Sequence, residues 1–272
     1  MSLAPPLGLI AGSGRLPMLF ASAARAAGHA VHAVGHRGET DAGLATQVDS
    51  LKWIRVGQID AIVAAFKSHG VEQAVMAGAI GRVRTLTGAR PDKGMLKVAA
   101  SLRSLRDDEF LRAIAGYFEK QGIRIVAATD YVKQVIAVEG HLAGPPLTLA
   151  QEADIALGRD VAAALGRADV GQTVVVKNGV VLAVEAIEGT DEAIRRGGRL
   201  GGPGAVVIKR AKPGQDLRFD LPAAGPVTLE VMREAGAAVL AVEAGKTVLL
   251  DGALLFKWAR KLGICVVGIR VE

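Results

Sequence analysis

Residues 7–28 read LGLIAGSGRLPMLFASAARAAG and combine a short apolar run, a glycine-containing turn and a segment with helical spacing. The run at 7–12 predicts a buried strand, and residues 16–28 predict a helix that ends at Gly28. A strand, a tight loop and a helix in this order are typical of the first unit of a parallel α/β sheet. The sequence therefore opens with the unit that doubly wound sheets repeat.

The rest of the first half repeats this alternation of strand and helix patterns. Three further strands are predicted at 29–35, 72–81 and 122–128, and three further helices at 58–70, 93–106 and 107–122. We therefore expect an α/β fold whose N-terminal domain, residues 1–140, is a Rossmann-like, doubly wound parallel sheet. Because half of all residues are apolar and only 4% are aromatic, its core is expected to be aliphatic.

The second half, residues 141–272, is predicted to be a smaller α/β domain with a mixed sheet. Asn178-Gly179 between two apolar runs is a strong hairpin signal. Residues 139–151 contain adjacent prolines and are the best linker, followed by a helix that Thr148 and Gln151 are expected to cap reciprocally. Further short strands are predicted at 205–211, 217–222, 238–251 and 264–271, with helices near 226–236 and 253–262.

Composition and charge narrow the class of protein. The chain has 33 basic and 27 acidic residues without a dense basic run, so we expect no nucleic-acid partner. The excess of positive charge suits phosphorylated substrates or an anionic membrane surface equally well. Cys265 is the only cysteine, which rules out an internal disulfide and a thiolate zinc site. The N-terminus lacks a signal-peptide pattern, and we expect a cytoplasmic protein.

The loop Gly12-Ser13-Gly14 lies between the first strand and the first helix. Backbone N–H groups at such a turn form a natural cradle for a phosphate, and a structural turn explains the glycines equally well. The third glycine of a dinucleotide fingerprint is replaced by Pro17. Gly35-His36-Arg37, at the end of the second strand, supplies no acidic residue for a ribose, so a classical NAD site is disfavoured.

The charged stretch KPGQDLRFDLPAAGP covers residues 212–226. Apolar and charged residues alternate in it, which predicts a strand with Asp216, Arg218 and Asp220 on one face. A solvated strand face explains this pattern as well. At about 3.3 Å per residue the two aspartates would lie roughly 13 Å apart, too far to share one metal ion. Asp220, near the Pro222 break, is the first choice for holding Mg²⁺ or orienting water, and Asp216 is the second.

A second polar cluster occupies residues 184–198, after the predicted hairpin. Glu185, Glu188, Thr190 and Asp191 lie between a strand and the predicted helix DEAIRR. A helix cap at Thr190 or Asp191 is one interpretation, and the lining of a phosphate or metal site is the other. The five histidines show no metal-binding spacing.

Four motifs together resemble a known family: GLIAGSGRLP (8–17), VVVKNGVVLAVEAIEGTDEAIRR (174–196), KPGQDLRFDLPAAGPVTLE (212–230) and LAVEAGKTVLLD (240–251). The chain resembles the UDP-2,3-diacylglucosamine pyrophosphatases of lipid A biosynthesis, of the type unrelated to calcineurin-like metallophosphoesterases. The resemblance implies a Mg²⁺-dependent hydrolase at the cytoplasmic face of the inner membrane. It would cleave a lipid-linked nucleotide sugar into UMP and 2,3-diacylglucosamine 1-phosphate (lipid X).

The resemblance also implies two domains with substrate held between them and an essential aspartate, which by motif is Asp216 or Asp220. We expect Asp220 to bind Mg²⁺ or position the attacking water, with Asp216 in support. The predicted substrate-binding residues, which would contact the phosphates or line the site, are Gly12, Ser13, Gly14, Lys212, Gln215, Arg218, Thr190 and Asp191.

Two other classes of function remain open on the residues alone. The glycine loop would suit a nucleotide-dependent oxidoreductase, although Pro17 and the missing ribose acid count against it. A non-catalytic regulator that binds nucleotide or lipid is the other alternative, because a fold does not prove catalysis. Peripheral contact with the inner membrane and a homodimer are both compatible with the sequence.

Overall fold

The computed structural model describes residues 4–80, 90–102, 107–214, 216–219 and 221–270. Two of the predicted site residues, Gln215 and Asp220, lie outside these ranges. The chain divides into two compact units. Unit 1 comprises Met1–Lys133 together with Asp216–Phe219, and unit 2 comprises Gln134–Gln215 and Asp220–Glu272. A short segment of the second half of the sequence therefore belongs to the first unit.

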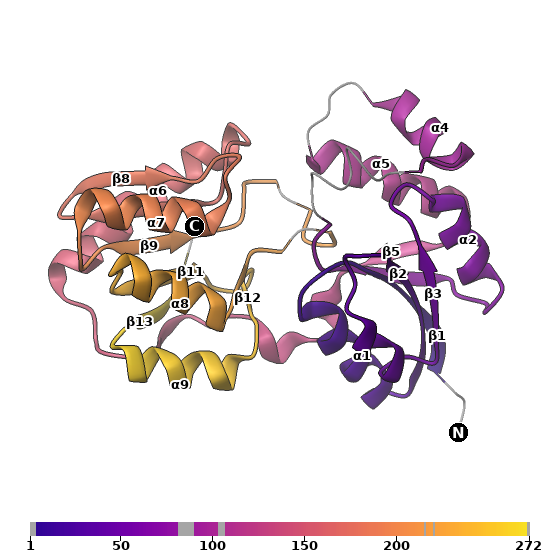
Figure 1. Cartoon of the computed structure of the whole chain (residues 1–272), viewed down its shortest axis with the longest axis horizontal. Helices are drawn as coiled ribbons and strands as arrows, with labels where there is room; N and C mark the ends of the chain where they lie inside the picture. Colours follow the sequence, from indigo (N-terminus) through magenta and orange to yellow (C-terminus); the bar gives the residue numbers. More distant parts are fainter. Residues whose placement is uncertain (1–3, 81–89, 103–106, 215, 220, 271–272) are drawn as a thin grey trace. The chain divides into compact units, whose positions relative to one another are not determined.

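Unit 1 contains a parallel sheet in the order β3-β2-β1-β4-β5 (Figure 1), as the alternation of strands and helices predicted. Its strands are β1 (Ala4–Ala11), β2 (His29–His36), β3 (Ser50–Ile54), β4 (Gln73–Ala77) and β5 (Arg124–Val126). Its helices are α1 (Leu16–Ala26), α2 (Ile59–Lys67), α4 (Lys93–Ser101) and α5 (Asp107–Lys120). Strand β3 was not predicted, because SLKWI has neither a long apolar run nor clean alternation.

Unit 2 contains a mixed sheet in the order β6-β13-β11-β9-β7-β8, in which β9, β11 and β13 are parallel. Its strands are β6 (Gly140–Ala143), β7 (Thr173–Lys177), β8 (Val180–Val184), β9 (Val206–Lys209), β11 (Val239–Glu243) and β13 (Cys265–Ile269). Two short strands, β10 (Ala223–Ala224) and β12 (Val248–Leu249), pair separately. The predicted mixed sheet is confirmed.

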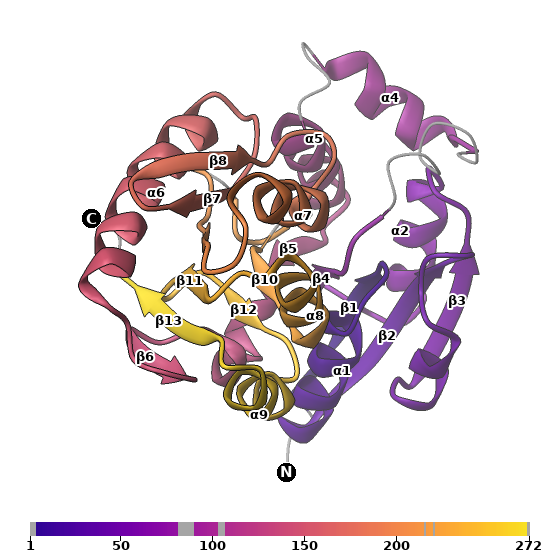
Figure 2. The ribbon, with the colours of Figure 1, turned by 60° about the vertical axis from the view of Figure 1, so that its left-hand side comes forward.

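Four helices cover the two faces of this sheet. They are α6 (Leu149–Arg167), α7 (Thr190–Gly201), α8 (Pro226–Ala235) and α9 (Gly252–Leu262). Alternate residues of each strand point to opposite faces. Val175 and Val207 pack in one core cluster with residues of α7, α8 and α9, whereas Val174 and Ile208 pack in another with α6. Figure 2 shows α7, α8 and α9 side by side as one layer.

The segment expected to be a linker, 139–151, is in part regular structure. Its residues 140–143 form β6, which pairs antiparallel with β13 at an edge of the second sheet. Strand pairing between residues more than 120 positions apart leaves no local signal, so this strand was missed. The expected cap of the next helix is confirmed. Oγ1 of Thr148 accepts from the N–H of Gln151, and Oε1 of Gln151 accepts from the N–H of Thr148.

The predicted hairpin at Asn178-Gly179 joins β7 and β8. Both turn residues have positive φ, 51° and 74°, as a type I′ turn requires. Their N–H groups donate to the two carboxylate oxygens of Asp154 on α6, at 2.9 and 2.7 Å. Asp154 is only 3% exposed. A buried carboxylate therefore ties the tip of the hairpin to the helix behind it.

Asp154→Ala is expected to destabilise unit 2 by about 2–3 kcal/mol, because two N–H groups of the hairpin turn lose a buried, charged acceptor. Urea denaturation should show a lower midpoint for this variant. Asp154→Asn keeps one carbonyl acceptor and should lose less. If Asp154→Ala unfolded at the wild-type midpoint, the hairpin would not depend on this carboxylate.

The expected strand at 217–222 is wrong for the residues that are described. Residues 216–219 form a turn, closed by a hydrogen bond of 3.1 Å from the N–H of Phe219 to the carbonyl of Asp216. The alternation of apolar and charged residues misled the prediction, because the apolar side chain of Phe219 packs against the core of unit 1. Tertiary packing, and not strand pairing, buries it.

The described residues contain no helix with the length and hydropathy needed to span a bilayer.

Candidate functional site

The glycine loop lies at the carboxyl edge of the first sheet, where the strand order reverses. Strand β1 pairs with β2 on one side and β4 on the other, so the loop after β1 occupies the switch point at which doubly wound sheets bind ligands. The N–H of Gly12 donates to the carbonyl of Ala77 (2.8 Å), and the N–H and Oγ of Ser13 donate to the carbonyl of Ala79 (2.7 and 2.9 Å). These donors fasten the loop to the end of β4.

The two glycines of the loop have different surroundings. A Cβ on Gly12 would lie 2.4 Å from the carbonyl oxygen of Ala79, so this position tolerates no side chain. Gly14 has a φ of 89° and open space where a Cβ would project. The exposed Arg15 follows it and precedes the first turn of α1, at the positive end of the helix dipole. Within the predicted loop, Gly14 therefore faces solvent. The cation beside it, Arg15, was not among the predicted site residues.

A buried histidine supports this loop from β2. Nδ1 of His36 and Oγ1 of Thr40 both donate to the carbonyl of Ala11, at 2.9 and 2.6 Å. Burial lowers the pKa of His36 below its ordinary 6.5, although the bond to Ala11 and the charge of Glu39 act in the opposite direction. On the same strand, His32 stacks on His69 with the ring centroids 3.9 Å apart. Burial and the charge of His69 lower the pKa of His32, and the charge of Asp49 acts in the opposite direction.

Unit 1 is therefore expected to lose stability in mild acid. The unfolded chain takes up protons on these histidines at a higher pH than the folded chain does, so stability falls as pH drops below the unfolded value. The melting temperature should decline as the pH falls from about 7 to about 5. His36→Gln should show a shallower decline. An equally steep decline in that variant would mean that other groups govern the acid sensitivity.

The turn at residues 216–219 carries two of the predicted site residues. Nε and Nη2 of Arg218 donate to Oδ1 and Oδ2 of Asp216, at 3.0 and 2.8 Å, and the N–H of Arg218 also donates to Oδ1. These bonds with Arg218 lower the pKa of Asp216. Nη1 of Arg218 reaches Glu119 on α5 at 3.2 Å. Both carboxylate oxygens of Asp216 are thus engaged in holding a guanidinium.

A polar cluster lies at one edge of the second sheet, where β8 and β9 end and β7 and α7 begin. We call its members, Thr173, Glu185, Thr190 and Lys209, the lysine cluster. Nζ of Lys209 donates to Oγ1 of Thr190 (3.2 Å) and to the carbonyl of Ala223 (2.9 Å). Oγ1 of Thr190 donates to Oε1 of Glu185 (3.2 Å) and lies 3.3 Å from Oγ1 of Thr173. A hydroxyl therefore links a buried ammonium to a buried carboxylate.

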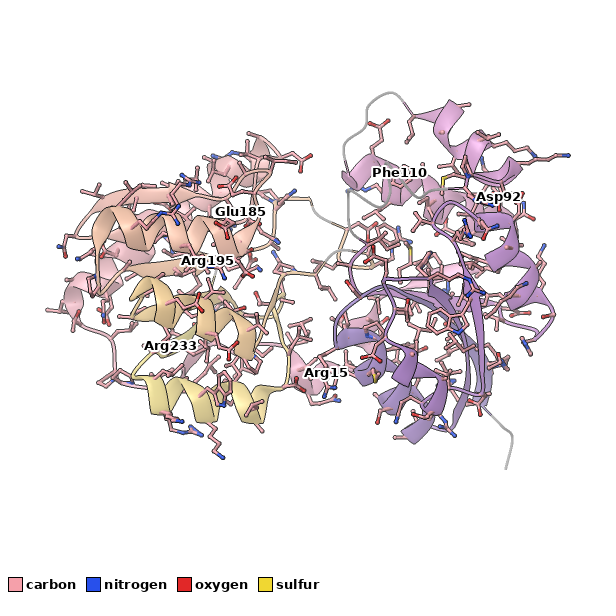
Figure 3. The ribbon with its side chains drawn as sticks, viewed as in Figure 1. Arg15, Asp92, Phe110, Glu185, Arg195 and Arg233 are labelled. Atoms are coloured by element: carbon pink, nitrogen blue, oxygen red, sulfur yellow. The ribbon has the colours of Figure 1, made fainter. Side chains whose placement is uncertain are left out.

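The electrostatics of this cluster are unusual for a protein interior. Glu185 and Lys209 are only 8% and 7% exposed, and charged side chains are rarely buried as deeply as this. Oε2 of Glu185 is buried and has no hydrogen-bond partner among the described residues. Glu185 is labelled in Figure 3. An unsatisfied carboxylate oxygen beside a helix N-terminus can bind a cation or accept a hydrogen bond from a water molecule.

The predicted cap of α7 is not formed by Thr190 or Asp191. Gly189, with a φ of 84°, is the N-cap residue, and Thr190 and Asp191 are the first residues of the helix. The hydroxyl of Thr190 is instead used within the lysine cluster. Asp191 lies in the first turn, where its charge is favourable to the helix dipole.

Lys212 takes part in an ion pair. Its Nζ lies 2.8 Å from Oδ1 of Asp169, which follows α6, and both side chains are about one-fifth exposed. Among the described residues, no group of three or more His, Cys, Asp or Glu side chains is arranged to hold a metal ion.

Comparison with known proteins decides the family. The model of the LpxI N-terminal domain matches residues 6–135, and that of the LpxI C-terminal domain matches residues 138–267. The chain belongs to the LpxI family. A relative from Caulobacter vibrioides, named UDP-2,3-diacylglucosamine pyrophosphatase LpxI, is 35% identical over 97% of both chains. The resemblance stated from the motifs is confirmed.

The similarity of the chain to solved structures is much weaker than its similarity to the Caulobacter relative. The enzyme WbmG of Bordetella bronchiseptica, in complex with NAD and UDP, is 17% identical over 43% of this chain and 34% of its own, with a TM-score of 0.29. A biotin carboxylase complex of Campylobacter jejuni is 14% identical over 71% of this chain and 41% of its own, with a TM-score of 0.28. At these scores, neither likeness supports an argument about function.

Proposed function

We propose that this LpxI-family protein hydrolyses the pyrophosphate of UDP-2,3-diacylglucosamine to UMP and 2,3-diacylglucosamine 1-phosphate, a step of lipid A biosynthesis. The observation that carries the proposal is the 35% identity, over nearly the whole of both chains, to a relative that bears this activity as its name. That relative is a hydrolase by name, which argues against the oxidoreductase and the non-catalytic regulator.

The chemistry of the reaction requires positive charge close to the phosphates. Hydrolysis places additional negative charge on the leaving phosphate, and fixed cations and N–H dipoles stabilise it. The lysine cluster supplies a buried ammonium at the first turn of α7, whose N–H groups point in the direction an anion needs. We assign Lys209 to a phosphate oxygen and Thr190 to orienting the ammonium. Gly14 and Arg15 form a second anion-binding position, in unit 1.

Carboxylates are the kind of ligand that a magnesium ion takes. Mg²⁺ is usually held by one or two carboxylates together with water and phosphate oxygens, and it would neutralise charge on the pyrophosphate when bound. Glu185, with its unsatisfied buried oxygen, and Asp220, by its place in the motif, are the carboxylates that we propose hold it. Asp216 is less suited, because Arg218 occupies both of its oxygens. We propose that Asp216 positions Arg218.

The location of the protein follows from its substrate. A diacylated nucleotide sugar is held in a membrane by its acyl chains, so the enzyme must reach a lipid surface. We propose that it acts from the cytoplasm, where UMP is released, with peripheral contact to the inner membrane. A homodimer is compatible with this arrangement.

Phosphorus NMR of the purified protein with UDP-2,3-diacylglucosamine and Mg²⁺ tests the activity. The diphosphate resonances should be replaced by those of two phosphate monoesters, and excess EDTA should prevent the change. Substrate binding without any such conversion would favour the regulator. A change in NADH fluorescence on titration, in the absence of conversion, would favour the oxidoreductase.

A further inference from the structure

A groove lies between α7 and α8 at their C-terminal ends, at the opposite end of α7 from the lysine cluster. This open groove has a volume of about 460 Å³, within the range of small-molecule sites. Thr190 and Arg199 are nine residues apart on one helix, which places the groove about 14 Å from the cluster. The lining residues are Arg195, Gly198, Arg199, Gly202, Pro203, Arg233, Glu234, Ala235 and Gly236.

The floor of the groove is mostly backbone. A Cβ on Gly198 would lie 2.3 Å from the carbonyl oxygen of Ala235, so the two helices approach each other closely here. The backbone N–H groups at this place are already bonded: that of Gly202 donates to Gly198, and that of Gly236 donates to Arg233. The polar groups left to recognise a ligand are therefore the side chains around the floor.

Three guanidinium groups surround this floor, and they differ in their partners. Arg195 is held by Glu192 at 2.7 Å and by Glu234 at 3.5 Å. The guanidinium groups of Arg199 and Arg233 have no hydrogen-bond or ion-pair partner within the described ranges of the chain. Figure 3 shows Arg195 on α7 and Arg233 on α8, so the charges come from two helices.

Basic residues in the last turn of a helix also stabilise its dipole, and this effect alone would explain single arginines at these positions. Helix α9 shows what that effect produces without a groove, because Arg260 and Lys261 occupy its last turn. In the α7–α8 groove, two unpaired guanidinium groups line the same concave site. A phosphate would relieve their mutual repulsion and accept paired hydrogen bonds from the planar guanidinium groups.

We propose that the groove is a second anion site, which binds a phosphate group through Arg199 and Arg233. Arg195 also lines the groove, but its guanidinium is already paired with Glu192 and Glu234. The phosphate can belong to a lipid headgroup or to a soluble phosphate monoester. Leu200, next to Arg199, is 67% exposed, and its apolar side chain suits contact with a lipid surface.

NMR of the arginine side chains during titration with inorganic phosphate tests the site. The Nε–H signals of Arg199 and Arg233 should shift and saturate together, whereas that of Arg260 should move little. The double variant Arg199→Gln/Arg233→Gln should lose this binding at least tenfold, with turnover unchanged. The matched control Arg260→Gln should bind as the wild type does. Unsaturable shifts, or equal phosphate affinity in the double variant, would overturn the proposal.

A second arm of the experiment identifies the source of the phosphate. Vesicles of phosphatidylglycerol in phosphatidylcholine should retain the wild-type protein more strongly than vesicles of phosphatidylcholine alone if a lipid supplies the group. Binding of inorganic phosphate without this retention would support a soluble ligand. Retention that is equal for the wild type and the double variant, with no phosphate-dependent NMR shifts, would contradict both versions.

Discussion

Replacing Lys209 with methionine is expected to lower the rate of UMP release by about a hundredfold or more, the range seen when one preorganised charge-stabilising group is lost. Methionine keeps the length and much of the volume of the side chain but removes its charge. The ammonium is buried and is held by Thr190 and the carbonyl of Ala223. Its position is therefore fixed before substrate binds, which makes its contribution large. Steady-state assays should show the loss in turnover.

A loss of stability must be separated from this loss of activity. Without Lys209, the buried carboxylate of Glu185 loses the ammonium to which Thr190 links it, and the variant will also unfold more easily. Asp154→Ala provides the matched control, because it weakens the same unit without touching the lysine cluster. At a temperature where both variants are folded, Asp154→Ala should keep normal turnover. Near-normal turnover in Lys209→Met would remove Lys209 from the site.

The second large effect concerns the aspartates of the charged stretch. We expect Asp220→Asn to reduce turnover by about a thousandfold, because it would remove a carboxylate that binds the metal or positions water. Asp216→Asn should cost only about tenfold, comparable to the loss of one charge-assisted hydrogen bond. This difference follows from the engagement of Asp216 with Arg218.

Arg218→Gln gives an internal check on the role of Asp216. If Asp216 acts by holding Arg218, the double variant Asp216→Asn/Arg218→Gln should be no slower than the slower single variant, because residues that act as a unit are not additive. Independent, multiplying effects would show that Asp216 has a role of its own. A larger loss in Asp216→Asn than in Asp220→Asn would reverse the assignment.

Local signals in the sequence were sufficient for much of the fold. The hairpin at Asn178-Gly179 and the cap formed by Thr148 and Gln151 depend on neighbouring residues, and both are confirmed. Strand β6 and the turn at residues 216–219 depend on partners far away in the chain. Their sequences were therefore interpreted as a linker and as a strand.

The candidate site shows the same division. The glycine loop was recognised because a strand, a glycine turn and a helix follow one another. Lys209 was missed, because it ends an apolar run in which a charged residue looks like the edge of a strand. Only the sheet brings Lys209 opposite Thr173, and only α7 adds Thr190 to them. The sequence did contain one useful signal, which was a charged residue directly after four apolar residues.

The most direct test of the account is hydrolysis of UDP-2,3-diacylglucosamine in ¹⁸O-water, with and without Mg²⁺. We predict UMP release that depends on the metal, with the label in one of the two products, which identifies the phosphorus that water attacks. Absence of UMP with every divalent metal tested would contradict the assignment of this protein as a pyrophosphatase.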